Sequence, residues 1–304
     1  MSLTRIRGKE HLTRAILTIL VAACPVIAVG QAPPKVQAPA PRTIVLPQKA
    51  IAGAPATLAV LDAAGRTLPN VIVELSSGQK VTTDVTGRAL FTAPGEAGVL
   101  IAQIPGRNTI KSSTVVNLPN PTPQGSSESP AAGPRMLSYP HFLSIHDQFT
   151  IEGAGFRGEA DANRVYLADQ LCLVLASSPV SLVVLPGLHI PIGDAGLRLS
   201  VTGLSAGPNP VVLVLLEFSG PPGALNVGAQ GTLTVHVRGA RERLVVEVRN
   251  ASPKIIQLPR GNVQRVTTSG GKPNIAEIEM KFLAPGNYTV TARLIPTASR
   301  VPDL

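Results

Sequence analysis

A complete G-x-G-x-x-G spacing occurs in the stretch FTIEGAGFRG, where Gly153, Gly155 and Gly158 follow a short apolar run. In a dinucleotide site this spacing needs a buried parallel strand before it, a long helix after it and a ribose-binding acid about 20 residues further on. Asp169 stands near the acid position, but a β pattern resumes at Val165, after room for about one helical turn. We therefore expect these glycines to form a turn in a β-sheet rather than a nucleotide site.

The same loop gathers oxygen-bearing side chains, namely Glu152, Glu159, Asp161, Asn163 and Asp169. Carboxylate and amide oxygens are the ligands that Ca²⁺ prefers, and Asp161 and Asp169 are its candidate ligands here. Their spacing differs from that of an EF-hand, so a solvated turn is favoured and no metal site is predicted. Because loops at the ends of β-sandwiches present residues to partners, Glu159, Asp161, Asn163 and Asp169 are candidate binding residues.

A second loop, with the sequence SGGKPN, is the other candidate contact surface, and its polar residues are Ser269 and Asn274. The basic stretch VRGARER precedes it and contains Arg238, Arg241 and Arg243. Such a stretch is typical of a solvated hairpin end, so we assign no ligand to it.

No arrangement of nucleophile and base stands out in the sequence. His141 and His146 flank Asp147, but a separation of five places the two rings on opposite faces of a strand, and no third partner is near. A solvated turn is therefore expected there. Ser177, Ser178 and Ser269 lack the strand-to-helix elbow of a hydrolase nucleophile. The sequence predicts no catalysis and no cofactor.

The composition favours many short strands joined by turns. The 304 residues include 28 Gly and 29 Pro, with no Trp, and 44% of the residues are hydrophobic. Proline cannot donate within a helix or a central strand, and glycine weakens both. The sequence therefore predicts an all-β protein of tandem Ig-like β-sandwich domains joined by Pro-rich linkers.

The first 32 residues are predicted to be an export signal. Four cations precede an apolar segment from Ala15 to Val29, and small residues follow where a signal peptidase would cut. The segment is too short and interrupted for a membrane span, which needs about 20 residues. An alternative interpretation of VAAC as a lipobox places a lipid anchor on Cys24, although Pro25 follows it directly. No transmembrane span is expected in the mature chain.

Charge and cysteine content exclude several classes of function. The formal net charge is +9, but the basic residues are scattered and no aromatic residues are interleaved with them, so nucleic acid is not predicted as a partner. A mildly basic surface suits the anionic polymers of a cell envelope. Outside the leader the sole cysteine is Cys172, so we expect no intramolecular disulfide and no cysteine metal site.

Shifts in composition divide the chain. The predicted parts are a Pro-rich spacer at 33–42, an Ig-like domain at 43–118, a Pro/Ser/Gly linker at 119–134, a second Ig-like domain at 135–229, a C-terminal β-sandwich at 230–297 and a tail at 298–304. The break NVGAQG near residue 229 is short, so the sequence leaves open whether residues 135–297 form one domain or two.

Alternation is clear in residues 43–118. The segments TLAVL, NVIVEL, KVTT and RALFTA read as strands, with Gly65, Gly78 and Gly87 at the turns. Ala89, Phe91 and Ala93 share one face and are expected in a core. The order AGRTLPNVIVEL followed by TTDVTGRALFTAP resembles bacterial Ig-like domains of the invasin type and carboxypeptidase-regulatory-like domains, which implies a sandwich fold and no particular function.

The middle segment resembles the IPT/TIG family of Ig-like domains. The similar residues are Pro140, then Phe149 to Ile151, Gly153, Gly155 and Phe156, with VYLAD and NPVVLVLL as later strands. Because glycine tolerates unusual backbone conformations, we expect Gly153 and Gly155 to allow a bulge or a positive φ before Phe156 enters the core. The section LVVLPGLHIPIGDAG is longer than in the family, so strand pairing there stays open.

The last segment repeats the β pattern, and GTLTVHVRG, RLVVEVRN, NVQRVTT, NIAEIEMKF and GNYTVTARL are its expected strands. It resembles the C-terminal half of secreted IPT/TIG-type bacterial proteins.

Together these patterns predict a non-catalytic, exported protein of the bacterial cell envelope, located in the periplasm, at the surface or outside the cell. Adhesion, protein–protein recognition and structural scaffolding are its expected roles, with an envelope protein or a polysaccharide as partner. One alternative is a polysaccharide-binding accessory module, which is weakened because sugar platforms use exposed Trp or Tyr and the candidates are Tyr139, Tyr166 and Tyr288. The other is an enzyme whose site is assembled from distant loops, which would require a deep pocket with perturbed acids.

Overall fold

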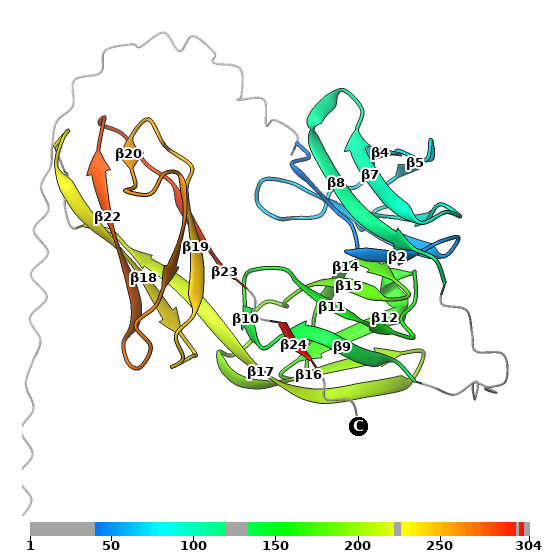
Figure 1. The fold of residues 1–304 in the computed structure, drawn as a ribbon. Coiled ribbons are helices and arrows are strands. Elements are labelled where there is room, and N and C mark those ends of the chain that lie inside the picture. The colour runs from blue at the N-terminus through cyan, green and yellow to red at the C-terminus, as the bar shows by residue number, and fades with distance from the viewer. Residues whose placement is uncertain (1–39, 120–132, 222–225, 296–297, 301–304) are drawn as a thin grey trace, which may run out of the picture. The chain divides into compact units, whose positions relative to one another are not determined.

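The computed structural model describes residues 40–119, 133–221 and 226–295, and the backbone of 298–300 (Figure 1). The whole predicted leader with Cys24, most of the 33–42 spacer and most of the 119–134 linker lie outside these residues. The described part is all-β, as predicted, and forms tandem Ig-like β-sandwiches with a single short 3₁₀ turn. None of its helices is long and apolar enough to cross a membrane.

Module 1, residues 43–118, is a sandwich of two sheets around one core. One sheet contains β1 (Thr43–Val45), β3 (Pro55–Leu61) and β6 (Arg88–Thr92), and the other has the order β2 (Lys49–Ile51), β8 (Arg107–Asn117), β7 (Gly98–Ile104), β4 (Ile72–Leu75) and β5 (Lys80–Thr82). Ala89, Phe91 and Ala93 are buried in the core, which confirms the predicted face. Gly87 illustrates the turn chemistry, because its φ is +75° and a Cβ there would overlap Thr67 and Leu68.

Module 2, residues 135–214, packs two sheets around Ile151, Phe156 and Leu213. One contains β9 (Arg135–Pro140), β11 (Phe149–Ala154), β15 (Ser181–Leu185) and β14 (Leu173–Ser178). The other contains β13 (Gln170–Leu171), β12 (Asn163–Leu167), β16 (Gly193–Val201), β17 (Leu204–Ser219) and β10 (Phe142–Ser144). The section whose pairing the sequence left open contributes β15, which pairs with β11 and β14, and then a loop and the start of β16.

Module 3, residues 215–295, contains the five predicted C-terminal strands. Its first sheet has the order β17, β18 (Gln230–Arg238), β22 (Asn274–Phe282) and β20 (Ile256–Gln257), and its second has the order β21 (Val263–Thr267), β19 (Val245–Asn250) and β23 (Val290–Leu294). The predicted tail differs from expectation, since β24 (Ala298–Arg300) pairs with β9 of module 2.

Strand β17 belongs to two sandwiches. Its residues 204–213 pair with β16 of module 2, and 215–219 pair with β18 of module 3. Around the crossing point Val211 and Leu213 lie in the core of module 2, whereas Val212 and Val214 lie in the core of module 3. The junction is therefore within one strand and not at residue 229, where the sequence places it, and no linker separates these modules.

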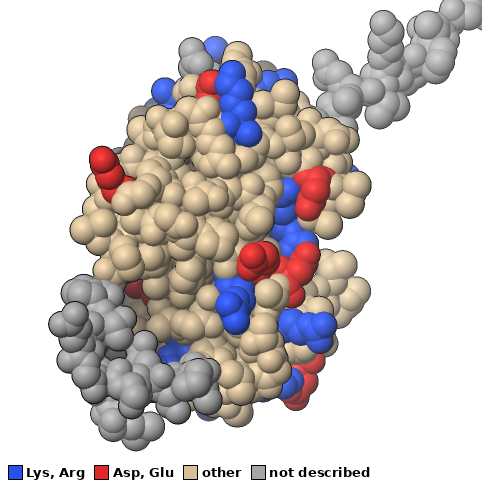
Figure 2. Space-filling view, turned by 90° about the vertical axis from the view of Figure 1, so that its right-hand side faces the viewer, with Lys and Arg blue, Asp and Glu red and all other residues tan. Residues whose placement is uncertain are grey.

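Modules 1 and 2 are joined through a shared sheet. Ser177 of β14 pairs with Thr57 of β3, which also pairs with β1 and β6, so one sheet continues across the junction. A separate apolar cluster packs at this joint, formed by Val45, Ala59, Leu61, Leu175, Ala176 and Val183. Much of the face of the molecule shown in Figure 2 is uncharged, and basic and acidic groups lie next to one another at its top and along its right-hand side.

Candidate binding cleft

The G-x-G-x-x-G glycines have structural roles. A β-bulge occurs between Glu152 and Gly153, where a Cβ would overlap the carbonyl oxygen of Arg135 and the ring of Phe156. Gly155 has a φ of +75°, and Phe156 is buried. The 3₁₀ turn η1 (Ala160–Ala162) and then β12 follow, where a dinucleotide fold would need a long helix. The predicted bulge, positive φ and buried phenylalanine are confirmed.

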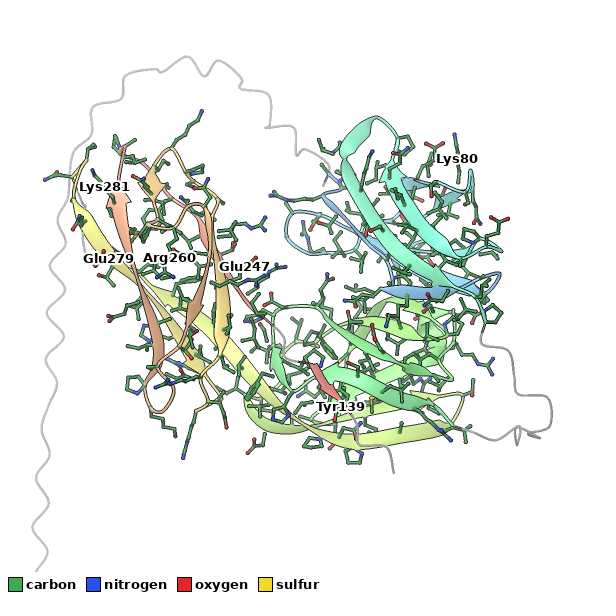
Figure 3. All side chains as sticks on the ribbon, viewed as in Figure 1. Lys80, Tyr139, Glu247, Arg260, Glu279 and Lys281 are labelled. Atoms are coloured by element: carbon green, nitrogen blue, oxygen red, sulfur yellow. The ribbon has the colours of Figure 1, made fainter. Side chains whose placement is uncertain are left out.

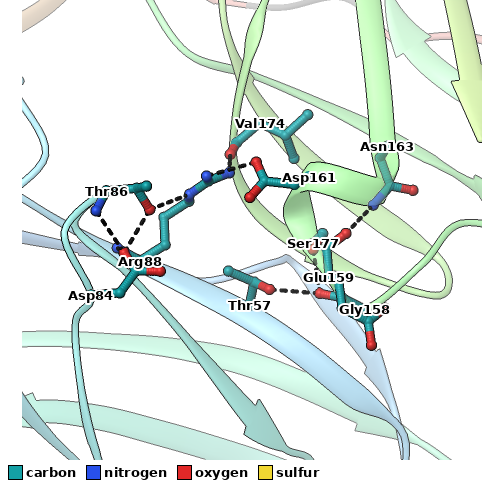
Figure 4. Close-up of polar contacts among 10 residues, drawn as sticks. All are labelled: Thr57, Asp84, Thr86, Arg88, Gly158, Glu159, Asp161, Asn163, Val174 and Ser177. Carbon is teal, nitrogen blue, oxygen red and sulfur yellow. Dashed lines mark hydrogen bonds and ion pairs between the residues drawn. The ribbon is translucent and has the colours of Figure 1, made fainter.

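Gly158 holds module 2 against module 1. A Cβ at this position would overlap the backbone of Pro55, so a residue without a side chain is required. The Gly158 carbonyl accepts hydrogen bonds from the Thr57 hydroxyl, at 2.7 Å, and from the Ser177 hydroxyl (Figure 4). All three residues come from the shared-sheet joint, which explains why the backbones approach so closely.

Asp161 pairs with a buried arginine from the other module. The Arg88 side chain is 9% exposed, and its Nη2 lies 2.7 Å from Asp161 Oδ1, while Nη1 donates to the carbonyl of Val174 and Nε donates to Thr86 Oγ1 (Figure 4). The Asp161 carboxylate is 83% exposed, so solvent screens that end of the pair. Asp161 therefore takes part in a contact between modules 1 and 2, while most of its carboxylate stays exposed to solvent.

Asn163 is buried and stabilises the loop internally. Its Nδ2 donates to the carbonyls of Arg157, at 2.8 Å, and Glu159, at 2.9 Å, and its Oδ1 accepts from the amide of Arg157 at 2.9 Å. With a residue exposure of 3%, the amide group has no face left for a partner. Glu159 enters this network through its backbone carbonyl.

Asp161 and Asp169 do not form one Ca²⁺ site. They flank opposite ends of β12, which spans about 13 Å at about 3.3 Å per residue, whereas Ca²⁺ ligands lie about 2.4 Å from the ion. Asp169 is exposed, has a φ of +61° and lies 3.5 Å from Arg198. The part of the chain that the structure describes holds no group of three or more His, Cys, Asp or Glu side chains arranged for a metal ion.

Ser269 and Asn274 also serve the fold. Ser269 Oγ accepts from the amide of Ile275 at 3.1 Å. Asn274, which is 4% exposed, donates to the carbonyls of Ala240, at 3.2 Å, and Glu242, at 2.8 Å. These bonds hold two turns of module 3 together. Because the Asn274 side chain is buried in this contact, the prediction that it is presented to a partner is wrong.

A cleft of about 640 Å³ lies where all three modules meet. Module 1 contributes residues near β1 and on β8, module 2 contributes residues from β9 to β11 and Val183 of β15, and module 3 contributes Leu294. Its lining combines hydroxyl and amide side chains with apolar ones: Gln48, Ser112, Ser113, Ser138, Gln148 and Thr150, and Val45, Leu46, Phe142, Leu143 and Val183. The cleft was not predicted, because its walls come from segments far apart in sequence.

Polar contacts fix the wall between modules 1 and 2. Gln48 Nε2 donates to Thr150 Oγ1 at 3.2 Å, and Lys49 Nζ lies 2.9 Å from Glu152 Oε2. The backbone carbonyl of Lys49 accepts from Ser178 Oγ at 2.6 Å. The Glu152 carboxylate at the cleft is thus paired, which leaves Asp147 as the other acid in the lining.

The surroundings of Asp147 differ from the solvated turn that the sequence predicts. Burial raises the pKa of its carboxyl group, while smaller effects from the Ser144 hydroxyl, His146, Arg293 and the Leu294 amide lower it. Arg293 of module 3 is itself 2.9 Å from Glu247, which lies on the sheet β21–β19–β23 (Figure 3). The expected solvated turn is therefore partly enclosed by module 3.

We predict that Asp147→Asn raises the free energy of unfolding at pH 7. The carboxyl group binds its proton more tightly in the folded state, so the wild type loses stability as pH rises from the unfolded pKa through the raised folded pKa. The variant should lack this loss and should match the wild type near pH 3. Urea unfolding from pH 3 to 8 measures it, and parallel curves for the two proteins would contradict the enclosed position of Asp147.

None of the three tyrosines forms an open platform. Tyr139 is 6% exposed at the cleft (Figure 3), and burial raises the pKa of its hydroxyl. The Tyr166 ring is covered by the Arg198 guanidinium at 4.4 Å, and Tyr288 packs edge-on against Phe282 at 5.7 Å. Their rings are already in contact with protein, so stacking on a sugar would require rearrangement.

No family model matches the chain, and no curated protein matches it. Among solved structures, SGBP-B of the Bacteroides ovatus mixed-linkage glucan utilization locus, in complex with a mixed-linkage heptasaccharide, is 14% identical over 88% of this chain and 63% of its own, with a TM-score of 0.22. The full extracellular region of plexin A4 is 14% identical over 86% of this chain and 33% of its own, with a TM-score of 0.33. An I-band fragment of titin is 14% identical over 84% and 94%, with a TM-score of 0.19.

The chain thus spans less than two thirds of the length of the first two of these structures. At these identities and TM-scores the similarities carry no argument about ligands or activity.

Proposed function

We propose that this chain is an exported, non-catalytic recognition protein of the bacterial cell envelope, and that the cleft between its modules binds an extended segment of a partner protein. The observation that carries the proposal is the three-module cleft, together with the buried contacts that hold its walls. Export is supported by the charged and apolar pattern of residues 1–32.

Two short strands at the cleft favour a peptide. Among the described strands, β1 pairs with β3 alone and β10 pairs with β17 alone, so each has one edge without a strand partner. Both strands contribute residues to the cleft lining. An extended peptide can add to such an edge through its backbone, while its side chains enter apolar pockets.

The lining chemistry supports the same ligand. Serine, threonine and glutamine side chains offer hydrogen bonds to peptide groups, and the half-buried Phe142 offers apolar contact. A polysaccharide is the less favoured ligand, because two of the three aromatic residues in the lining, Tyr139 and Phe149, are buried and present no open ring.

The carboxylates of the cleft support a non-catalytic role. Glu152 is paired with Lys49, and burial favours the protonated form of Asp147. The Ser144 hydroxyl and His146 lie beside Asp147, but among the described contacts Ser144 Oγ accepts from the backbone amide of His146, at 3.4 Å, and not from its imidazole ring. The fold thus supplies shape and hydrogen bonds at this site rather than a proton-transfer pair.

We predict that Ser113→Trp blocks the cleft and weakens peptide binding about tenfold or more, by filling space that the ligand needs. Ser113 is exposed, lines the cleft and forms no side-chain hydrogen bond among the described residues, so the fold should be retained. Thr82→Trp on β5 is the matched control, because Thr82 is exposed and lies outside the cleft lining.

A displayed library of random peptides, selected on the purified protein, supplies the ligands, and an array of neutral polysaccharides is tested beside it. The proposal expects peptides that bind the wild type and Thr82→Trp but not Ser113→Trp. Failure to enrich such peptides would contradict the proposal, and polysaccharide binding lost in Ser113→Trp would replace the peptide with a sugar ligand.

A further inference from the structure

A second pocket, of about 470 Å³, lies in module 3 and is separate from the cleft. It forms where the end of β18 and the following turn, residues 236–241, meet the turn before β22, residues 271–274. From the sequence, the first turn is predicted to be a solvated hairpin end and the second a contact loop. The structure brings the two turns together.

The pocket is lined by cations. Arg238, Arg241, Lys272 and His236 contribute to its walls, and no Asp or Glu among the described residues does. Arg238 is paired with Glu217 at 2.9 Å, whereas neither Arg241 nor Lys272 forms a salt bridge within the described part of the chain. Two exposed cationic side chains therefore border a concave, acid-free surface, which favours an anion.

Glu242 is the acid adjacent in sequence, and it does not neutralise the pocket wall. Its Oε2 accepts from the backbone amide of Arg241 at 3.0 Å, which turns the carboxylate toward the main chain of its own turn. His236 is also engaged, since its Nε2 lies 2.8 Å from Ser219 Oγ. The groups free to meet a ligand are the Arg241 guanidinium and the Lys272 ammonium.

Hydrogen bonds fix the positions of the two turns. The buried Asn274 side chain donates to Ala240 and Glu242, and its Oδ1 accepts from the Gly270 amide at 2.9 Å. The Gly271 amide donates to the Arg241 carbonyl at 2.6 Å. Because these bonds set the spacing of the backbones that carry the two cations, binding need not first order the turns.

We propose that this pocket binds the phosphate group of a small phosphorylated molecule. A guanidinium matches phosphate oxygens with two parallel donors, and a lysine ammonium adds a point charge. The volume falls within the range of small-molecule pockets, about 300 to 1,000 Å³, and leaves room for a polar group such as a sugar beside the phosphate. This inference is independent of the peptide cleft.

Isothermal titration calorimetry with glucose 1-phosphate tests the site, with glucose and inorganic phosphate as comparison ligands. Lys272→Gln and Arg241→Gln remove the two charges at exposed positions that do not build the core. Arg260→Gln is the matched control, because Arg260 is an exposed arginine of the same module outside the pocket lining (Figure 3).

We expect saturable binding of glucose 1-phosphate and none of glucose. Each pocket variant should weaken binding about tenfold or more, and Arg260→Gln should leave it unchanged. Inorganic phosphate bound with the same dependence on Lys272 and Arg241 would also support a phosphate site and would identify the free ion as its ligand. Absence of saturable binding, or equal weakening by Arg260→Gln, would overturn the proposal.

Discussion

Replacing Gly158 with valine should undock module 1 from module 2 and lower the free energy of unfolding by about 3 kcal/mol. The added Cβ would overlap backbone atoms of Pro55, which cannot rotate aside as a flexible side chain could. The hydrogen bonds from Thr57 and Ser177 to the Gly158 carbonyl would be lost as the backbones separate. Urea unfolding followed by circular dichroism measures the change.

Gly95→Val is the matched control for this substitution. Gly95 is an exposed glycine whose added Cβ would meet no atom within 4 Å, so we expect a change of less than about 0.5 kcal/mol. A Gly158→Val protein as stable as the Gly95→Val protein would show that the two backbones do not approach each other in solution.

Asn163→Ala should lower the free energy of unfolding by about 3 kcal/mol, because one buried side chain satisfies two carbonyls and one amide of its loop. Alanine would leave the polar groups of Arg157 and Glu159 without these partners. The loop would then no longer hold Gly158 and Asp161 against module 1. Thermal and urea unfolding of the same sample measure the loss.

Asp169→Asn is the matched control for Asn163→Ala, because Asp169 is an exposed residue near the same strand. Asparagine tolerates the positive φ of residue 169, and the ion pair with Arg198 is long and exposed, so the expected change is below about 0.5 kcal/mol. Equal effects of the two substitutions would contradict the distinction between a buried loop residue and a solvated one.

Much of the fold could be predicted from the local pattern of residues in the sequence. Alternation predicted the strands of modules 1 and 3, and glycine chemistry predicted the bulge at Gly153 and the positive φ at Gly155. These features depend on residues close together in sequence, where side-chain period and backbone preference act directly. The burial of Phe156 followed from the same reasoning.

Two of the candidate residues contact partners that are distant in sequence. Asp161 meets Arg88 across the module joint, and Asn274 meets the carbonyls of Ala240 and Glu242. A polar residue in a loop is compatible with solvent exposure or with satisfying buried backbone groups, and the sequence around Asn163 and Asn274 does not distinguish the two.

The boundary between modules 2 and 3 was hidden for a related reason. The run VVLVLL has no turn residue, and its consecutive apolar side chains enter two different cores. A continuous apolar run normally indicates a strand buried on both faces of one domain. Here it marks a strand shared by two sandwiches.

The most direct test of the central claim, that docked modules form a preformed cleft, is a distance measurement by pulsed electron paramagnetic resonance. Spin labels at Thr82→Cys in module 1 and Arg164→Cys in module 2 would report on the joint, in a protein with Cys24 and Cys172 replaced by alanine. Both label positions are exposed. We predict one narrow distance distribution in this protein and a broad one after Gly158→Val. A broad distribution before that substitution would contradict the account.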